Sequence, residues 1–278
     1  MAADYQRWGL TTPHLAQQLP VYPAKRRAAP DRRAVTFISN AQMTLSRVMG
    51  FTGLSRLMFT YTQLSMAILP TFVLITTVRS LAGDREAGVF EYLLGLPVPL
   101  GAWYWGKLAG RFLMVFTPVF LAMLGAVIWG GMSGVEIPWR LFVYYTGLLM
   151  ALSWCFLGIG MLISSLSRSV DVAQGAAFIV WLTLLLFLDL VLLGVMIQQQ
   201  VPAETAVGIA LANPMQVFRT GTMMLFDPQP VLLGPVAYVI LDTFGGTGYM
   251  LYALLYPTLL GTLMAWLGFI VFRHGDLV

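Results

Sequence analysis

One segment of the sequence comes close to a nucleotide-binding motif. Residues Gly101–Leu108 read GAWYWGKL, near the phosphate-binding loop G-x-x-x-x-G-K-[ST], in which backbone amides and a lysine cradle phosphates. Leu108 replaces the Mg²⁺-binding serine or threonine, aromatic residues fill the loop, and no strand pattern precedes it. Aromatic residues beside a lysine are also typical of the interfacial belt at the start of a membrane span. We therefore expect this chain to bind no nucleotide and no other cofactor.

A cluster of charged residues stands shortly before this segment. Asp84, Arg85 and Glu86 are followed by Glu91, and we predict one helix over 84–94. A helix here exceeds what a simple connection between two long apolar runs requires. Its charged groups would then be free to dock a soluble partner. The alternative is a merely solvated turn. The apolar face of the predicted helix consists of Val89, Phe90, Leu93 and Leu94.

Asp189 stands in the middle of an apolar run, TLLLFLDLVLL. A carboxylate at such depth costs about 3 kcal/mol on insertion scales and is a functional candidate by default. The alternatives are protonation or a hydrogen bond across a helix interface. Since the apolar runs offer no second charge to relay a proton, we favour the structural interpretation.

Other residue types offer little chemistry. The single cysteine, Cys155, excludes a disulfide framework or a CxxC motif, and the two histidines, His14 and His274, are far apart in the sequence. Three methionines could bind Cu(I) through soft thioethers, but methionine is frequent throughout the chain, so we expect no metal site and no enzymatic activity. These methionines are Met215, Met223 and Met224.

The composition is that of an all-α polytopic membrane protein. Apolar residues make up 58% of the 278 residues and charged residues 10%, against about 25% charged residues in soluble domains. A spanning helix needs about 20 mostly apolar residues, and five stretches qualify. They are 57–78, 108–129, 141–163, 173–197 and 250–272. Glycine pairs in and beside these spans suit close helix approach, namely Gly106-x-x-x-Gly110 and Gly158-x-Gly160.

Basic residues orient the spans. Two of them, Arg140 and Arg219, lie at one set of span ends. The opposite set of span ends carries six basic residues. Because cytoplasmic ends carry the excess of basic residues, we predict that this richer set, and with it the C-terminus, is cytoplasmic. Residues 198–248 then form an outer loop, with a short interfacial helix over 230–241. The richer set is Arg79, Arg85, Lys107, Arg111, Arg168 and Arg273.

The N-terminal region conflicts with this orientation. Residues 1–56 hold eight basic residues, although five spans would place them outside. We predict a disordered basic tail over 1–33 and a single transmembrane domain over 34–278 that begins with an interfacial segment. The net charge of +4 gives no indication of a nucleic-acid partner.

The charged segment resembles the permease subunits of the ABC-2 class of ABC transporters. In that class a span leads into G-[DE]-R-E-x-G-x-x-E-x-L-L-x-x-P and then a GK pair. The corresponding residues are Gly83, Asp84, Arg85, Glu86, Gly88, Glu91, Leu93, Leu94, Pro97, Gly106 and Lys107. The resemblance implies a type V exporter-like domain of six spans, of which five are visible, in the inner membrane of a bacterium or archaeon. It also implies a homodimer and a separate cytoplasmic ATPase docked on 84–94.

Two short stretches are similar to one branch of the class, the permease of the nitrous oxide reductase maturation (Nos-type) transporter. They are Gly50–Arg56 and Asn213–Arg219. This similarity implies support for assembly of the copper–sulfide centre of a periplasmic reductase in denitrification. It also implies a periplasmic accessory protein that contacts Asn213, Pro214 and Arg219. The alternatives are an ABC-2 exporter of another cargo, such as a drug, a lipid or a haem-related compound, and an assembly scaffold that transports nothing.

Overall fold

The computed structural model describes residues 53–134, 138–187, 203–226 and 235–274. Met1–Thr52 and Gly53–Val278 form separate units, and all the described residues belong to the second. The predicted tail over 1–33 and the segment up to residue 52 lie outside the described residues, as does Asp189.

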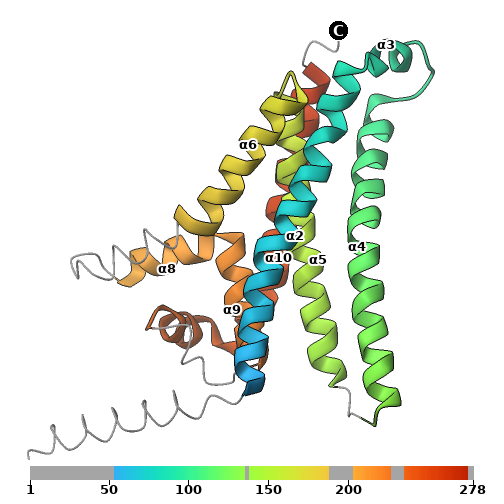
Figure 1. Ribbon diagram of the computed structural model, residues 1–278. Coiled ribbons are helices and arrows are strands. Elements are labelled where there is room, and N and C mark those ends of the chain that lie inside the picture. The colour runs from blue at the N-terminus through green and yellow to red at the C-terminus, as the bar shows by residue number, and fades with distance from the viewer. Residues whose placement is uncertain (1–52, 135–137, 188–202, 227–234, 275–278) are drawn as a thin grey trace, which may run out of the picture. The chain divides into compact units, whose positions relative to one another are not determined.

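The described residues form helices joined by short turns, with no strand among them (Figure 1). Within the described part of the chain, four helices contain stretches long and apolar enough to cross a membrane, namely Thr60–Glu86, Leu100–Met132, Trp139–Leu166 and Gly245–His274. This confirms the all-α polytopic membrane class. The helices are α2 (Gly53–Glu86), α3 (Val89–Leu94), α4 (Leu100–Met132), α5 (Trp139–Leu166), α6 (Val170–Leu182), the π-helix η2 (Thr183–Phe187), α8 (Ala203–Ala212), α9 (Pro214–Phe226) and α10 (Pro235–His274).

The predicted spans fall within these helices, except for the last part of the fourth span, which no described residue covers. The fourth span, 173–197, begins in a shorter apolar helix, Val170–Leu186, and its last part, 188–197, lies outside the described residues. The helices are longer than the predicted spans because the polar turns at their ends continue the helical backbone, as in α2, which runs on to Glu86.

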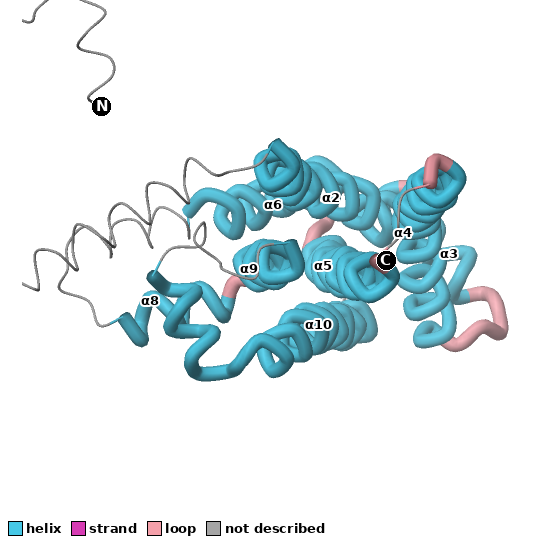
Figure 2. The backbone as a smooth tube through the Cα atoms, turned by 90° about the horizontal axis from the view of Figure 1, so that it is seen from below, coloured by secondary structure: helices cyan, strands magenta, loops and turns pink. Residues whose placement is uncertain are grey.

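Helix α5 forms the centre of the bundle. It lies between α2 and α10, with α9 beside it and α4 on the far side (Figure 2). In the most apolar part of α5, 61% of the residues are buried, against 11% in α4. Helix α4 therefore leaves most of its apolar surface exposed in the single chain, whereas α5 is the element on which the others pack.

Glycines bring α5 and α10 into backbone contact. A Cβ atom at Gly158 would lie 2.0 Å from the carbonyl oxygen of Gly261, and one at Gly261 would lie 2.6 Å from the Cα atom of Cys155. Small residues at helix interfaces allow such approach in membranes. The prediction for the second glycine pair is confirmed, whereas Cβ atoms at Gly106 and Gly110 would meet nothing within 4 Å.

Much of the predicted outer loop over 198–248 is helical, because α8, α9 and the start of α10 occupy it. Helix α9 is amphipathic and packs into the bundle, with Met215, Val217 and Phe218 buried. At 13 residues it is too short to cross a bilayer, which is why a search for spans missed it. The part of 230–241 that is described, from Pro235, is helical, and α10 then changes direction at Gly245, whose φ is 66°.

Candidate functional site

The charged segment before α4 forms a sharp corner rather than the single helix predicted over 84–94. Helix α2 continues to Glu86, and α3 begins only at Val89. Between them Gly88 has a φ of 68°, in the left-handed region that favours glycine and commonly ends a helix. The helix predicted over 84–94 is therefore interrupted, because Gly88 in the left-handed conformation ends α2 and turns the chain into α3.

Helix α3 is held by one buried aromatic residue. Phe90 is 2% exposed, and its ring centroid lies 5.6 Å from that of Trp103 in α4 and 5.5 Å from that of Phe272 in α10. Trp103 and Phe272 stack on each other at 5.6 Å. Aromatic pairs at these distances stabilise by about 0.5–1.5 kcal/mol beyond the burial of their area. A short helix of six residues is thereby fixed to two long helices.

The same cluster explains the segment Gly101–Leu108. It is the first part of α4, so its backbone is helical and does not form the loop that a phosphate group needs. Its aromatic residues pack within the protein: Tyr104 is fully buried and donates a hydrogen bond to the carbonyl oxygen of Ala265 at 2.8 Å. The near-match to a nucleotide-binding motif is therefore a packing segment.

The outer side of the α2–α3 corner is exposed. Glu91 is exposed, and Tyr92, Leu96 and Val98 are 79%, 57% and 43% exposed. Within the described part of the chain, the carboxylate of Glu91 has no ion-pair partner. Exposed apolar side chains that gather in one patch mark a surface for contact with a protein or a membrane. We call Glu91, Tyr92, Leu96 and Val98 the α3 surface.

Asp84 braces α2 against α4. Its carboxylate forms an ion pair with Lys107, and the same ammonium group donates to the carbonyl oxygen of Ser80 at 2.7 Å. Lys107 also lies 4.6 Å from the centre of the Trp103 ring, within cation–π range. The two charged groups are about one-fifth exposed, at 24% and 20%, so they serve a contact between helices.

Arg85 and Glu86 brace α2 against the turn between α5 and α6. Arg85 Nη1 donates to the carbonyl oxygen of Ser167 at 2.7 Å, and Glu86 Oε1 accepts from the backbone amide of Val170 at 2.8 Å. Val170 opens α6, so Glu86 satisfies one of the free amides at that helix start and favours its positive end. Both charges thus bind a neighbouring element of the same chain.

A buried serine, which sequence reasoning missed, completes this attachment. Ser164 in α5 accepts hydrogen bonds from the amides of Leu81 and Ala82 and donates to the carbonyl oxygen of Val78 at 2.6 Å. The sequence contains only the weak signal of a polar SSLS stretch at the end of an apolar run. Together with Asp84, Arg85 and Glu86, Ser164 joins the ends of α2, α4, α5 and α6.

The residues predicted to contact an outer partner, Asn213, Pro214 and Arg219, do not form an exposed surface. Asn213 is 1% exposed; its Nδ2 donates to the carbonyl oxygen of Leu184 at 2.8 Å, and its Oδ1 accepts from the amide of Met215 at 3.0 Å. It therefore caps α9 from inside the protein, and the adjoining Pro214 is also buried. Arg219 is half-buried and interacts within the structure. Asn213 and Pro214 thus lie inside the protein, because they form the start of α9 and not a loop surface.

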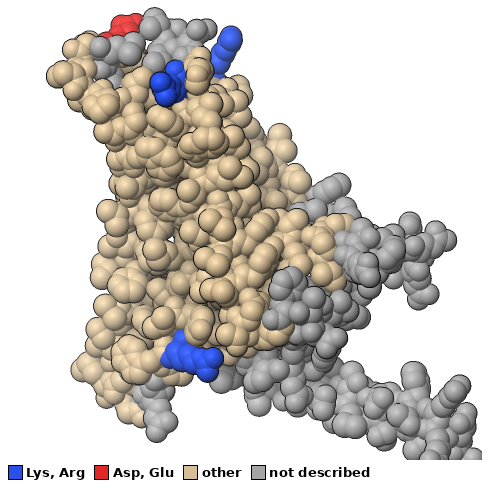
Figure 3. Space-filling model, turned by 180° about the vertical axis from the view of Figure 1, so that it is seen from behind, with Lys and Arg blue, Asp and Glu red and all other residues tan. Residues whose placement is uncertain are grey.

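The charges gather at the ends of the helix bundle. The helix ends that carry the six predicted basic residues meet at the same end as α3, because Arg85 contacts Ser167, Lys107 contacts Asp84, and Phe272 contacts Phe90. On the face drawn in Figure 3, a broad surface without charged side chains separates the basic groups near the two ends. Such a band matches the hydrocarbon layer of a membrane.

The fold and this site define a multi-pass helical membrane protein with a charged helical corner at one end. Comparison with known protein families matches residues 25–277 to the ABC-2 family transporter protein. The chain belongs to this family, whose permeases act in the membrane with an ATPase partner and are typically the non-catalytic component. The resemblance at class level is confirmed. No curated protein matches the chain.

Proposed function

We propose that this chain is the permease subunit of an ATP-driven transporter and that a separate cytoplasmic ATPase docks on the α3 surface. The observation that supports this is the contrast within one short helix. Phe90 is buried among aromatic residues of α4 and α10, whereas Tyr92 is 79% exposed. A helix anchored on one side and bare on the other can receive a partner and transmit its movement.

In this proposal Asp84, Arg85 and Glu86 transmit force and do not form the main docking contact. Their charged atoms bind Lys107, Ser167 and Val170. A displacement of α3 would pass through Phe90 to α4 and α10, and through the end of α2 to α5 and α6. The ATPase cycle would therefore move the bundle at several helices together.

The proposed orientation places α3 and the C-terminus in the cytoplasm. The end that carries α3 also carries most of the basic residues of the described helices, which favours the cytoplasmic side. Two copies of the chain would assemble as a homodimer, as the resemblance to ABC-2 permeases implies. The exposed apolar surface of α4 is compatible with contacts to lipid or to a second copy.

We propose that the transporter supports maturation of nitrous oxide reductase, because Gly50–Arg56 and Asn213–Arg219 are similar to stretches of the Nos-type permease. A periplasmic accessory protein would then bind the end opposite α3. Deletion of this chain should lower the copper content and activity of the reductase in the same cells. A fully loaded, active reductase in the deletion strain would reject this cargo and favour export of another compound or a scaffold role.

Co-purification of the partner ATPase tests the docking site. Glu91→Lys reverses a charge on the α3 surface and should lower recovery of the ATPase at least tenfold, since reversal at a desolvated contact costs about 2–5 kcal/mol. Glu86→Gln is the matched control, because its amide oxygen can still accept from Val170. Equal recovery of the ATPase with both variants would contradict docking through α3.

A further inference from the structure

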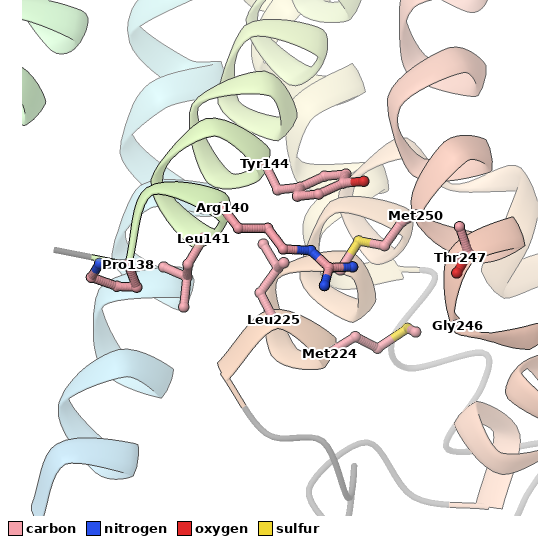
Figure 4. A pocket seen from close by; sticks show the side chains of 9 residues that line it. All are labelled: Pro138, Arg140, Leu141, Tyr144, Met224, Leu225, Gly246, Thr247 and Met250. Carbon is pink, nitrogen blue, oxygen red and sulfur yellow. The ribbon is translucent and has the colours of Figure 1, made fainter.

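A cavity lies at the end of the bundle opposite α3. It has a volume of about 420 Å³, within the range of about 300–1,000 Å³ typical of ligand pockets. The start of α5, the end of α9 and the bend of α10 line it (Figure 4). Its lining residues are Pro138, Arg140, Leu141, Tyr144, Met224, Leu225, Gly246, Thr247 and Met250.

Among the described residues that line the cavity, Arg140 is the only charged one. Its guanidinium group extends across the cavity toward Met250, above Leu225 and Met224, in Figure 4. The guanidinium carbon lies 5.9 Å from the centre of the Tyr144 ring, so the aromatic face supports the cation. No carboxylate of the described residues forms an ion pair with Arg140. The cavity therefore offers one positive charge to a ligand.

The other side chains of the lining are mostly apolar or polarizable. Leu141, Leu225 and two methionines supply hydrocarbon and thioether surface, and Thr247 supplies a hydroxyl group. Methionine side chains adapt to ligands of irregular shape. One cation against such a wall suits an amphiphile with one anionic group and a flexible hydrocarbon chain. A fully hydrated anion would gain little from the apolar part of this wall.

The position of the cavity points to the source of that amphiphile. Arg140 is in the first turn of α5, one of the membrane-length helices. Its neighbour Trp139 is 59% exposed, and Val143, one turn deeper, is 64% exposed. An exposed tryptophan followed by exposed aliphatic residues marks the boundary between head groups and hydrocarbon. The cavity thus lies where lipid phosphates and the first part of their acyl chains are found.

We propose that this cavity binds an anionic phospholipid of the surrounding leaflet. Its phosphate group pairs with Arg140, and the upper part of one acyl chain lies against Leu141, Leu225 and Met250. Because the walls come from α5, α9 and α10, the lipid bridges three helices at the end of the bundle remote from the ATPase.

Native mass spectrometry of the purified full chain in detergent tests the proposal, with phosphatidylglycerol and phosphatidylcholine of equal acyl chains as probes. We expect phosphatidylglycerol to bind at least fivefold more tightly than phosphatidylcholine. Arg140→Gln should remove this preference, because a hydrogen bond to a charged group is worth about tenfold or more in affinity. Arg140→Lys should retain part of it, and Arg168→Gln, an exposed arginine at the other end, should leave it unchanged.

A second pair of variants tests the cavity itself. Thr247 is exposed at its edge, so Thr247→Trp should block entry without disturbing the fold and should lower phosphatidylglycerol binding at least fivefold. Leu259→Trp, at a 65% exposed position of α10 outside the cavity, should not.

Two results would overturn the proposal. One is an unchanged lipid preference in Arg140→Gln together with full binding in Thr247→Trp. The other is displacement of the lipid by millimolar inorganic phosphate or glycerol phosphate, which would show a site for a free anion. Resistance to both soluble anions supports a lipid site.

Discussion

The close contact between α5 and α10 predicts that Gly158→Ala strongly destabilises the protein. The new Cβ atom would lie 2.0 Å from the carbonyl oxygen of Gly261, whereas such atoms essentially never approach closer than 3.0 Å. The two backbones must therefore separate by at least 1.0 Å, the difference between 3.0 and 2.0 Å. No flexible side chain can absorb this change, because the atom on the other side belongs to the backbone.

The cost should fall at the upper end of the range for overpacked cores, about 3 kcal/mol. For a domain of this size each kcal/mol lowers the midpoint of thermal unfolding by about 2–4 °C, so we expect a fall of roughly 6–12 °C. Thermal unfolding in detergent, followed by tryptophan fluorescence, measures it. Gly110→Ala is the control, because its Cβ atom would meet nothing within 4 Å. A Gly158→Ala midpoint within about 1 °C of the unsubstituted protein would refute the packing.

Two further predictions concern residues that sequence analysis singled out. Asn213→Ala should destabilise the protein by about 2 kcal/mol in the same unfolding assay, because it removes the hydrogen bonds to the part-buried carbonyl oxygen of Leu184 and to the buried amide of Met215; an unchanged midpoint would contradict the capping role. The purified chain without its partner should not bind ATP in equilibrium binding measurements, because Gly101–Leu108 is helical. Micromolar ATP binding that Lys107→Ala abolishes would overturn this prediction.

Composition and span length predicted the helical membrane class because burial in lipid imposes long apolar helices. The same criterion missed α9, whose 13 residues pack against other helices and do not cross the bilayer. The apolar spacing of Val89, Phe90, Leu93 and Leu94 predicted one continuous helix, whereas Gly88 ends α2 in the structure. Local spacing could not distinguish these alternatives, since the anchor of Phe90 is Phe272, far along the chain.

The internal roles of the charged residues could not be predicted for the same reason. Glu86 and Val170 are 84 positions apart, and Asp84 and Lys107 are 23 apart. The family pattern located the charged segment, but only the three-dimensional arrangement separates the residues that brace helices from Glu91, which faces outward. The capping role of Asn213 depends in the same way on Leu184.

Cross-linking from the α3 surface tests the central claim most directly. Cys155 is the only cysteine and is buried, so Cys155→Ala gives a background in which Tyr92→Cys or Trp139→Cys introduces a single thiol. We predict that Tyr92→Cys cross-links to the ATPase in membranes and resists an impermeant thiol reagent added outside intact cells. Trp139→Cys, at the other end, should react with that reagent and give no ATPase cross-link. The reverse pattern would contradict docking of the ATPase on α3.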